Sequence, residues 1–123
     1  MFTLIFRASV FAVLAACLLA SQTSTSNSTT AANFTGEWKV GLGVGSATFY
    51  ITLEKGGKAN KSQGSPNGTW TVFGDEARIT WEDGWHDVIR RAGNHWEKAA
   101  FAPGKSFSDP PSNITSATRT EPM

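Results

Sequence analysis

Apolar and polar residues alternate with a period of two through most of the chain between Phe34 and Phe101, and glycines punctuate the alternation. This pattern is typical of an antiparallel β-meander with short turns. No window in this region has apolar residues at the i, i+3, i+4 and i+7 spacing of an amphipathic helix. We therefore predict an all-β fold: a single antiparallel up-and-down meander of about six or seven strands, strongly curved into an open or small barrel. Helix is expected only in the N-terminal apolar segment.

The clearest hairpin lies between Asn67 and Trp81. With Gly74-Asp75 as a two-residue loop, its two strands pair residue by residue and one face becomes entirely apolar. That face carries Trp70, Val72, Ala77, Ile79 and Trp81. A slip of one residue would mix polar and apolar side chains on both faces, so the pattern determines this register.

The next hairpin is centred on Asp83-Gly84, a dipeptide typical of two-residue type I′ turns. Such a turn pairs Ile79 with Val88, so that Val88 faces inwards and Ile89 faces outwards. The same parity, continued after a turn near Gly93, places Glu97, Ala99 and Phe101 inside.

This register places Trp85, Ile89 and Trp96 on the outward face, where they are expected to bind a ligand or partner. His86, on the inner face next to Trp85, is expected to belong to the same binding site. The alternative is that the C-terminal segment covers these side chains, with Phe107 as its anchor. The sequence leaves both interpretations open.

The first 20 residues have the composition of a signal peptide. Arg7 precedes an uncharged apolar run of about 13 residues, which is shorter than the ~20 needed to span a bilayer. Residues 14–17, Leu-Ala-Ala-Cys, resemble the lipobox of bacterial lipoproteins, which implies cleavage before Cys17 and a lipid anchor on that residue. Cys17 is the only cysteine, so it has no disulfide partner in the chain. Cleavage after Ala20 is the alternative, and it would leave no anchor.

Composition divides the rest of the chain into three parts. Residues 21–33 are uncharged and rich in Ser and Thr, as in a flexible tether. Residues 34–102 form the predicted β-meander domain, and 103–123 are expected to be a disordered tail. Five asparagines begin N-x-[S/T] triplets, which are either glycosylation acceptors or a consequence of the Ser/Thr content: Asn27, Asn33, Asn60, Asn67 and Asn113.

The charge balance argues against nucleic acid as a partner. The chain has 11 basic and 10 acidic residues, so loss of Arg7 with the signal peptide leaves ten of each. A neutral domain lacks the excess positive charge that would attract nucleic acids and anionic membranes. We expect an exported protein of the periplasm or cell envelope, or a secreted one if Cys17 is removed.

The candidate groups for chemistry are few. His86 and His95 fall on different rungs of the predicted sheet, and His86 is expected to be a core or rim histidine. The adjacent carboxylates, such as Glu82 and Asp83, lie at hairpin tips and point into solvent. We therefore predict no catalytic residues, no metal site and no cofactor, and hence a non-enzymatic protein.

A resemblance supports the fold and the compartment. Gly36-Glu37-Trp38 is similar to the G-x-W start of lipocalin-like barrels, and the Trp spacing over 68–85 resembles small Trp-rich β-domains of exported bacterial proteins. The expected function is binding of an envelope protein, a glycan or a small apolar ligand. The alternative is a structural or inhibitor-like module without a small ligand. Because about 68 residues make a small core, any ligand is expected in a shallow groove or an open barrel mouth.

Overall fold

The computed structural model describes residues 30–120. The whole sheet lies within one compact unit that begins at residue 31. The predicted signal peptide, its cleavage sites and the tether up to residue 29 lie outside the described residues. In the described part of the chain, none of the helical residues forms a segment long and apolar enough to cross a membrane.

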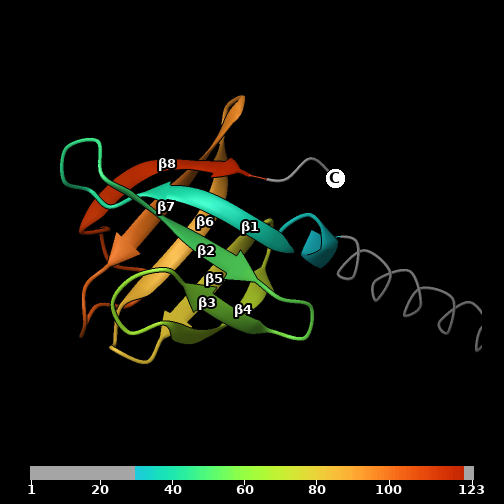
Figure 1. The fold of residues 1–123 in the computed structure, drawn as a ribbon, viewed down its shortest axis with the longest axis horizontal. Coiled ribbons are helices and arrows are strands. Elements are labelled where there is room, and N and C mark those ends of the chain that lie inside the picture. Colours follow the sequence, from blue (N-terminus) through green and yellow to red (C-terminus); the bar gives the residue numbers. More distant parts are fainter. Residues whose placement is uncertain (1–29, 121–123) are drawn as a thin grey trace, which may run out of the picture. The chain divides into compact units, whose positions relative to one another are not determined.

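Residues 31–120 form a closed antiparallel barrel in which neighbouring strands follow the sequence order (Figure 1). The prediction of an all-β meander curved into a small barrel is confirmed, with eight strands in place of six or seven. The strands are β1 (Gly36–Gly41), β2 (Thr48–Leu53), β3 (Lys58–Lys61), β4 (Asn67–Phe73), β5 (Glu76–Trp81), β6 (His86–Ala92), β7 (His95–Phe101) and β8 (Asn113–Arg119).

Strand β8 corrects the expectation of a disordered tail over 103–123. It pairs with β7 through Trp96 and Ala117 and with β1 through Trp38 and Arg119, and so closes the barrel. Its sequence, N-I-T-S-A-T-R, has little apolar alternation because Ala117 is its only buried residue. The strand is held by backbone hydrogen bonds on both edges. Every residue type except proline can form these bonds, so the side-chain pattern does not predict the strand.

The central hairpin has the predicted register. Trp70 pairs with Ile79 and Val72 with Ala77, around the two-residue loop that contains Gly74. Gly68 lies opposite Trp81, and a Cβ atom there would come within 2.6 Å of both the Thr80 carbonyl oxygen and the Trp81 ring. The absence of a side chain at Gly68 therefore lets the Trp81 indole lie close against β4.

The predicted register of the next hairpin is wrong by one residue. The loop has three residues, 82–84, because the Trp81 amide donates to the Trp85 carbonyl and Ile79 pairs with Asp87. Gly84 adopts a left-handed φ of 92° in this loop. A shift of one residue exchanges the faces of a strand, so both β6 and β7 are turned over relative to the prediction.

The exchange moves three expected core residues to the outside of the barrel. Val88, Ala99 and Phe101 form a second buried cluster, with Phe107 packed against it. Phe107 also stacks on His86, with ring centroids 5.0 Å apart. Phe107 therefore anchors the C-terminal segment to the barrel, but it covers Val88, Ala99 and Phe101 rather than the residues expected to face outwards.

The interior is filled by aliphatic and tryptophan side chains, and one end of the barrel is closed. Phe34 and Trp38 are fully buried there, and the Trp96 ring lies edge-on to both, 5.5 and 5.4 Å away. The Arg119 guanidinium lies 4.9 Å from the Trp38 ring and donates to the backbone oxygens of Thr35 and Asn33. Aromatic side chains and short turns thus seal this end.

Candidate functional site

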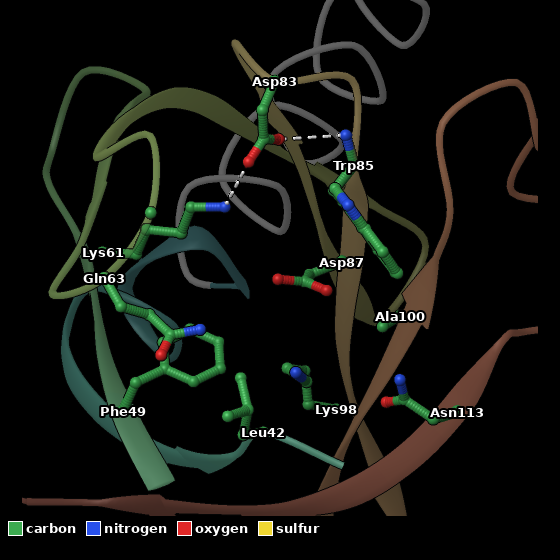
Figure 2. A pocket seen from close by; sticks show the side chains of 11 residues that line it. Leu42, Phe49, Lys61, Gln63, Asp83, Trp85, Asp87, Lys98, Ala100 and Asn113 are labelled. Carbon is green, nitrogen blue, oxygen red and sulfur yellow. Dashed lines mark hydrogen bonds and ion pairs between the residues drawn. The ribbon is translucent and has the colours of Figure 1, made fainter. Parts of the chain in front are cut away.

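A cavity of about 250 Å³ lies at the opposite end, the mouth of the barrel (Figure 2). Strand ends and the loops after β1, β3 and β5 surround it, together with β7 and the start of β8. The lining residues are Leu42, Phe49, Lys61, Gln63, Gly64, Asp83, Trp85, Asp87, Lys98, Ala100 and Asn113.

Asp87 and Lys98 face this cavity from the inner surfaces of β6 and β7 (Figure 2). They are the two buried charged residues of the described chain, with 4% and 3% of their surface exposed. Ion-forming side chains are rarely buried to this degree without a specific role or partner. Their position inside an otherwise apolar barrel marks the candidate site.

The two groups differ in how well their hydrogen-bonding capacity is used. The Asp87 carboxylate accepts a 2.8 Å hydrogen bond from the Trp81 indole nitrogen. The Lys98 ammonium lies 4.8 Å from the centre of the Phe49 ring and makes no hydrogen bond or ion pair with residues 30–120. An ammonium carries three donors, and none of these is used in a hydrogen bond with residues 30–120.

Burial alters the acidity of both groups. Desolvation raises the pKa of Asp87 above its ordinary value, although the nearby Lys98 charge and the Trp81 hydrogen bond oppose the shift. Desolvation lowers the pKa of Lys98, and the Asp87 charge opposes that shift. Both shifts favour the neutral forms, because a charge is poorly solvated at this depth.

Another polar residue of the cavity is Asn113, the first residue of β8. Its side-chain oxygen is enclosed by the protein and has no hydrogen-bond partner. A buried acceptor without a donor costs roughly 1–3 kcal/mol, so a donor from a water molecule or a ligand would stabilise this part of the site.

An ion pair forms the rim of the cavity. Lys61 Nζ lies 3.1 Å from the Asp83 carboxylate and 4.6 Å from the centre of the Trp81 ring. The second Asp83 oxygen accepts a 3.1 Å hydrogen bond from the Trp85 amide. Partial burial raises the pKa of Asp83, but these hydrogen bonds and the Lys61 charge outweigh it, so the pKa falls below its ordinary value. The two charged groups at the rim are therefore paired with each other, whereas Asp87 and Lys98, at the floor of the cavity, form no ion pair.

The structure separates the four residues predicted to form one binding site. Trp85 lies beside the cavity, at its rim. His86 lies outside the barrel under Phe107, and its Nδ1 is 3.1 Å from the Trp85 carbonyl oxygen. Ile89 is fully buried in the interior, and Trp96 packs at the closed end. The predicted aromatic surface therefore does not exist, and Trp85 alone of the four lines the cavity.

Sequence reasoning missed Asp87, Lys98 and Asn113. In the correct register, Asp87 and Lys98 break two otherwise apolar interior rows, and a charge in an interior row is a recognisable signal. The misassigned loop length hid that signal by placing both residues on the outside. Asn113 was missed because its strand was expected to be disordered.

Comparisons with known proteins give no independent guide. No protein-family model matches the chain, and searches of curated proteins and of solved structures find no significant match. Within residues 30–120, no group of three or more histidine, cysteine or acidic side chains is arranged to hold a metal ion. The lipocalin-like resemblance therefore stays a prediction, and the cavity has to be interpreted from its own chemistry.

Proposed function

We propose that the domain is a non-enzymatic binding protein for one small hydroxylated ligand, such as a single sugar unit, held in the barrel mouth. The observation that carries this proposal is the unused hydrogen-bonding capacity at the cavity floor. Lys98 has donors without partners, and the side-chain oxygen of Asn113, enclosed in the wall of the cavity, has no donor among the described residues. A hydroxyl group both donates and accepts, so a ligand with several hydroxyls matches both groups at once.

The walls of the cavity support the same ligand class. Trp85, Phe49 and Leu42 supply apolar surface beside the polar floor. An aromatic face packs well against the C–H face of a sugar ring, because both surfaces are apolar and flat. A volume of about 250 Å³ is slightly below the usual range for small-molecule sites, ~300–1,000 Å³, which favours a compact ligand.

Alternative ligand classes fit less well. A purely apolar ligand would leave Lys98 and Asn113 buried without partners, at a cost in binding free energy. The aromatic surface expected on β6 and β7 is not open to a protein partner. Ile89 lies in the barrel interior, and Phe107 covers the outer face of these strands. Among the functions predicted from the sequence, glycan binding is therefore the best supported.

A titration of the folded protein with monosaccharides and sugar alcohols tests the proposal. Binding is expected to change the emission of Trp85 and to shift its indole N–H resonance. Asn113→Leu should weaken binding by about tenfold, because it removes an acceptor that the ligand is proposed to satisfy. Ser116→Ala is the matched control, since this residue is on the exposed face of the same strand.

Two outcomes would contradict the proposal. One is the absence of binding to every hydroxylated ligand at millimolar concentration. The other is binding that Asn113→Leu leaves unchanged, which would place the ligand elsewhere. Absence of any ligand would favour the alternative of a structural or inhibitor-like module.

Export is also part of the proposal. Residues 1–20 carry the features of a signal peptide, and residues 14–17 resemble a lipobox. A binding domain held at the envelope by Cys17 would meet sugars from the surroundings or from the cell wall. The state of the mature N-terminus tests this placement separately from binding.

A further inference from the structure

The amine of Lys98 has an environment that the binding proposal does not explain. The residue exposes only 3% of its surface, its amine lies near the Phe49 ring, and it has no polar partner among residues 30–120. Arginine or a hydroxyl residue would donate hydrogen bonds to a sugar with a smaller desolvation cost. A desolvated lysine that faces a cavity is instead an arrangement that activates an amine as a nucleophile, and Asp87 places a carboxyl group in the same cavity.

We propose that Lys98 Nζ captures small aldehydes or ketones in the barrel mouth as an imine, with Asp87 as the proton donor and acceptor. The inference rests on the proposed function for its site, and it names the ligand class as a small hydroxylated carbonyl compound. A hydroxyl of such a ligand would donate a hydrogen bond to the Asn113 side-chain oxygen, and its carbonyl carbon would react with the Lys98 amine.

The reaction balances without an oxidant or a cofactor. The unprotonated Lys98 amine attacks the carbonyl carbon, a C–N bond forms, and the carbonyl oxygen takes a proton from the Asp87 carboxylic acid. The Asp87 carboxylate takes one proton from the nitrogen of the resulting carbinolamine and returns it to the hydroxyl, which leaves as water while a C=N bond forms. The carboxylate then takes the remaining proton from the nitrogen. The net change is amine plus carbonyl compound to imine plus water, and Asp87 ends as it began.

Burial of the two groups favours both required protonation states, although the charge of each group opposes the shift of the other. Burial lowers the pKa of Lys98, which increases the fraction of free amine, and raises the pKa of Asp87, which increases the fraction of carboxylic acid. Among the rim charges, Lys61 lowers the pKa of both groups, and Asp83 raises that of Asp87. Lys61 itself is paired with Asp83, so it is a poorer nucleophile than Lys98.

Reductive trapping tests the proposal. The folded domain is treated with erythrose, a four-carbon hydroxyaldehyde, and cyanoborohydride at neutral pH, and the modified lysines are mapped by peptide mass spectrometry. Lys98 is expected to react about tenfold faster than the exposed Lys105, although Lys105 is far more accessible. Lys105→Met should leave the reaction at Lys98 unchanged, and Asp87→Asn should slow it.

Erythritol, which has the same carbon skeleton but no carbonyl group, separates this inference from the binding proposal. Binding of erythritol without preferential trapping at Lys98 would overturn the imine and leave the binding proposal intact. Failure of both compounds to bind at the mouth would overturn both. Preferential trapping that persists after Asn113→Leu, but slows in Asp87→Asn, would support the imine and count against the role of Asn113.

Discussion

Asp87 and Lys98 are energetically unfavourable residues inside a barrel of this size. Each loses hydration, and the described residues supply only one hydrogen bond in return, from Trp81 to Asp87. Replacement of buried charged groups by uncharged residues of similar volume removes this desolvation cost and is often stabilising by about 1–4 kcal/mol. Two charged groups retained without an ion pair between them are more consistent with a binding role than with a structural one.

The double variant Asp87→Asn and Lys98→Met is therefore expected to be more stable than the wild type by about 1–4 kcal/mol in free energy of unfolding. The asparagine amide at position 87 still offers an acceptor to the Trp81 indole, and the methionine side chain fills the volume of the lysine stem. Urea unfolding, followed by tryptophan emission, measures the difference. A double variant less stable than the wild type would mean that the two charges stabilise the barrel.

The pH dependence of that difference follows from the directions of the two pKa shifts. Above 3.8 the folded wild type binds more protons at Asp87 than the unfolded chain, so its stability falls as the pH rises through the raised pKa. Below 10.5 the unfolded chain binds more protons at Lys98, so stability rises with pH from the lowered pKa to 10.5. The advantage of the double variant should therefore be largest between these limits and shrink towards both. Unfolding curves over the pH range measure it, and a constant difference would refute the assignment.

At the scale of elements, the loop at 82–84 determines the site. Asp-Gly suits a two-residue turn and also a three-residue loop whose last residue is left-handed, and the dipeptide alone does not distinguish them. In the structure, Asp83 is anchored by Lys61 from the β3 end and by the Trp85 amide. These contacts, one of them 22 residues away in the sequence, favour the longer loop and so turn Asp87 and Lys98 inwards.

The segment between β7 and β8 is a second element whose role is visible only in three dimensions. Phe107 shields Val88, Ala99 and Phe101 from solvent and contacts Arg78, whose guanidinium carbon is 4.9 Å from its ring. This segment thereby holds β8 in position to close the barrel.

Phe107→Ala is expected to lower the stability of the domain by about 1–3 kcal/mol, because Phe107 is only partly buried in the second cluster. Val44→Ala is the control, since Val44 is 70% exposed and its truncation should change stability by less than about 0.5 kcal/mol. Thermal unfolding of the two variants side by side makes the comparison. Equal effects would mean that the segment over 102–112 does not cover the cluster in solution.

At the scale of the whole domain, closure depends on β8. A chain that ends at residue 112 would expose the edges of β1 and β7, and open edges of a small sheet pair with other chains. We expect this truncated chain to unfold or aggregate, as seen by circular dichroism and size-exclusion chromatography. A chain that ends at residue 120 is the control and should remain folded and monodisperse. A soluble, folded product ending at 112 would show that β8 is dispensable.

The mature N-terminus is the remaining prediction at this scale. If residues 14–17 act as a lipobox, intact-mass analysis after expression in a bacterial host should show a diacylated or triacylated Cys17, and Cys17→Ser should abolish the modification. A product that begins at Ser21 would exclude the anchor and favour free secretion. Neither result bears on the barrel, whose described residues begin at 30.

The sequence by itself determined the fold class and the central hairpin, because alternation of large apolar and polar residues reports directly which face of a strand is buried. In residues 67–81 this alternation is complete on the inner face, and its register was predictable. Only the tertiary structure decided the site. The loop at 82–84 is chosen by contacts distant in the sequence, and β8 is held by backbone pairing that its side chains do not reveal. The cavity is formed where these two features bring Asp87, Lys98 and Asn113 together.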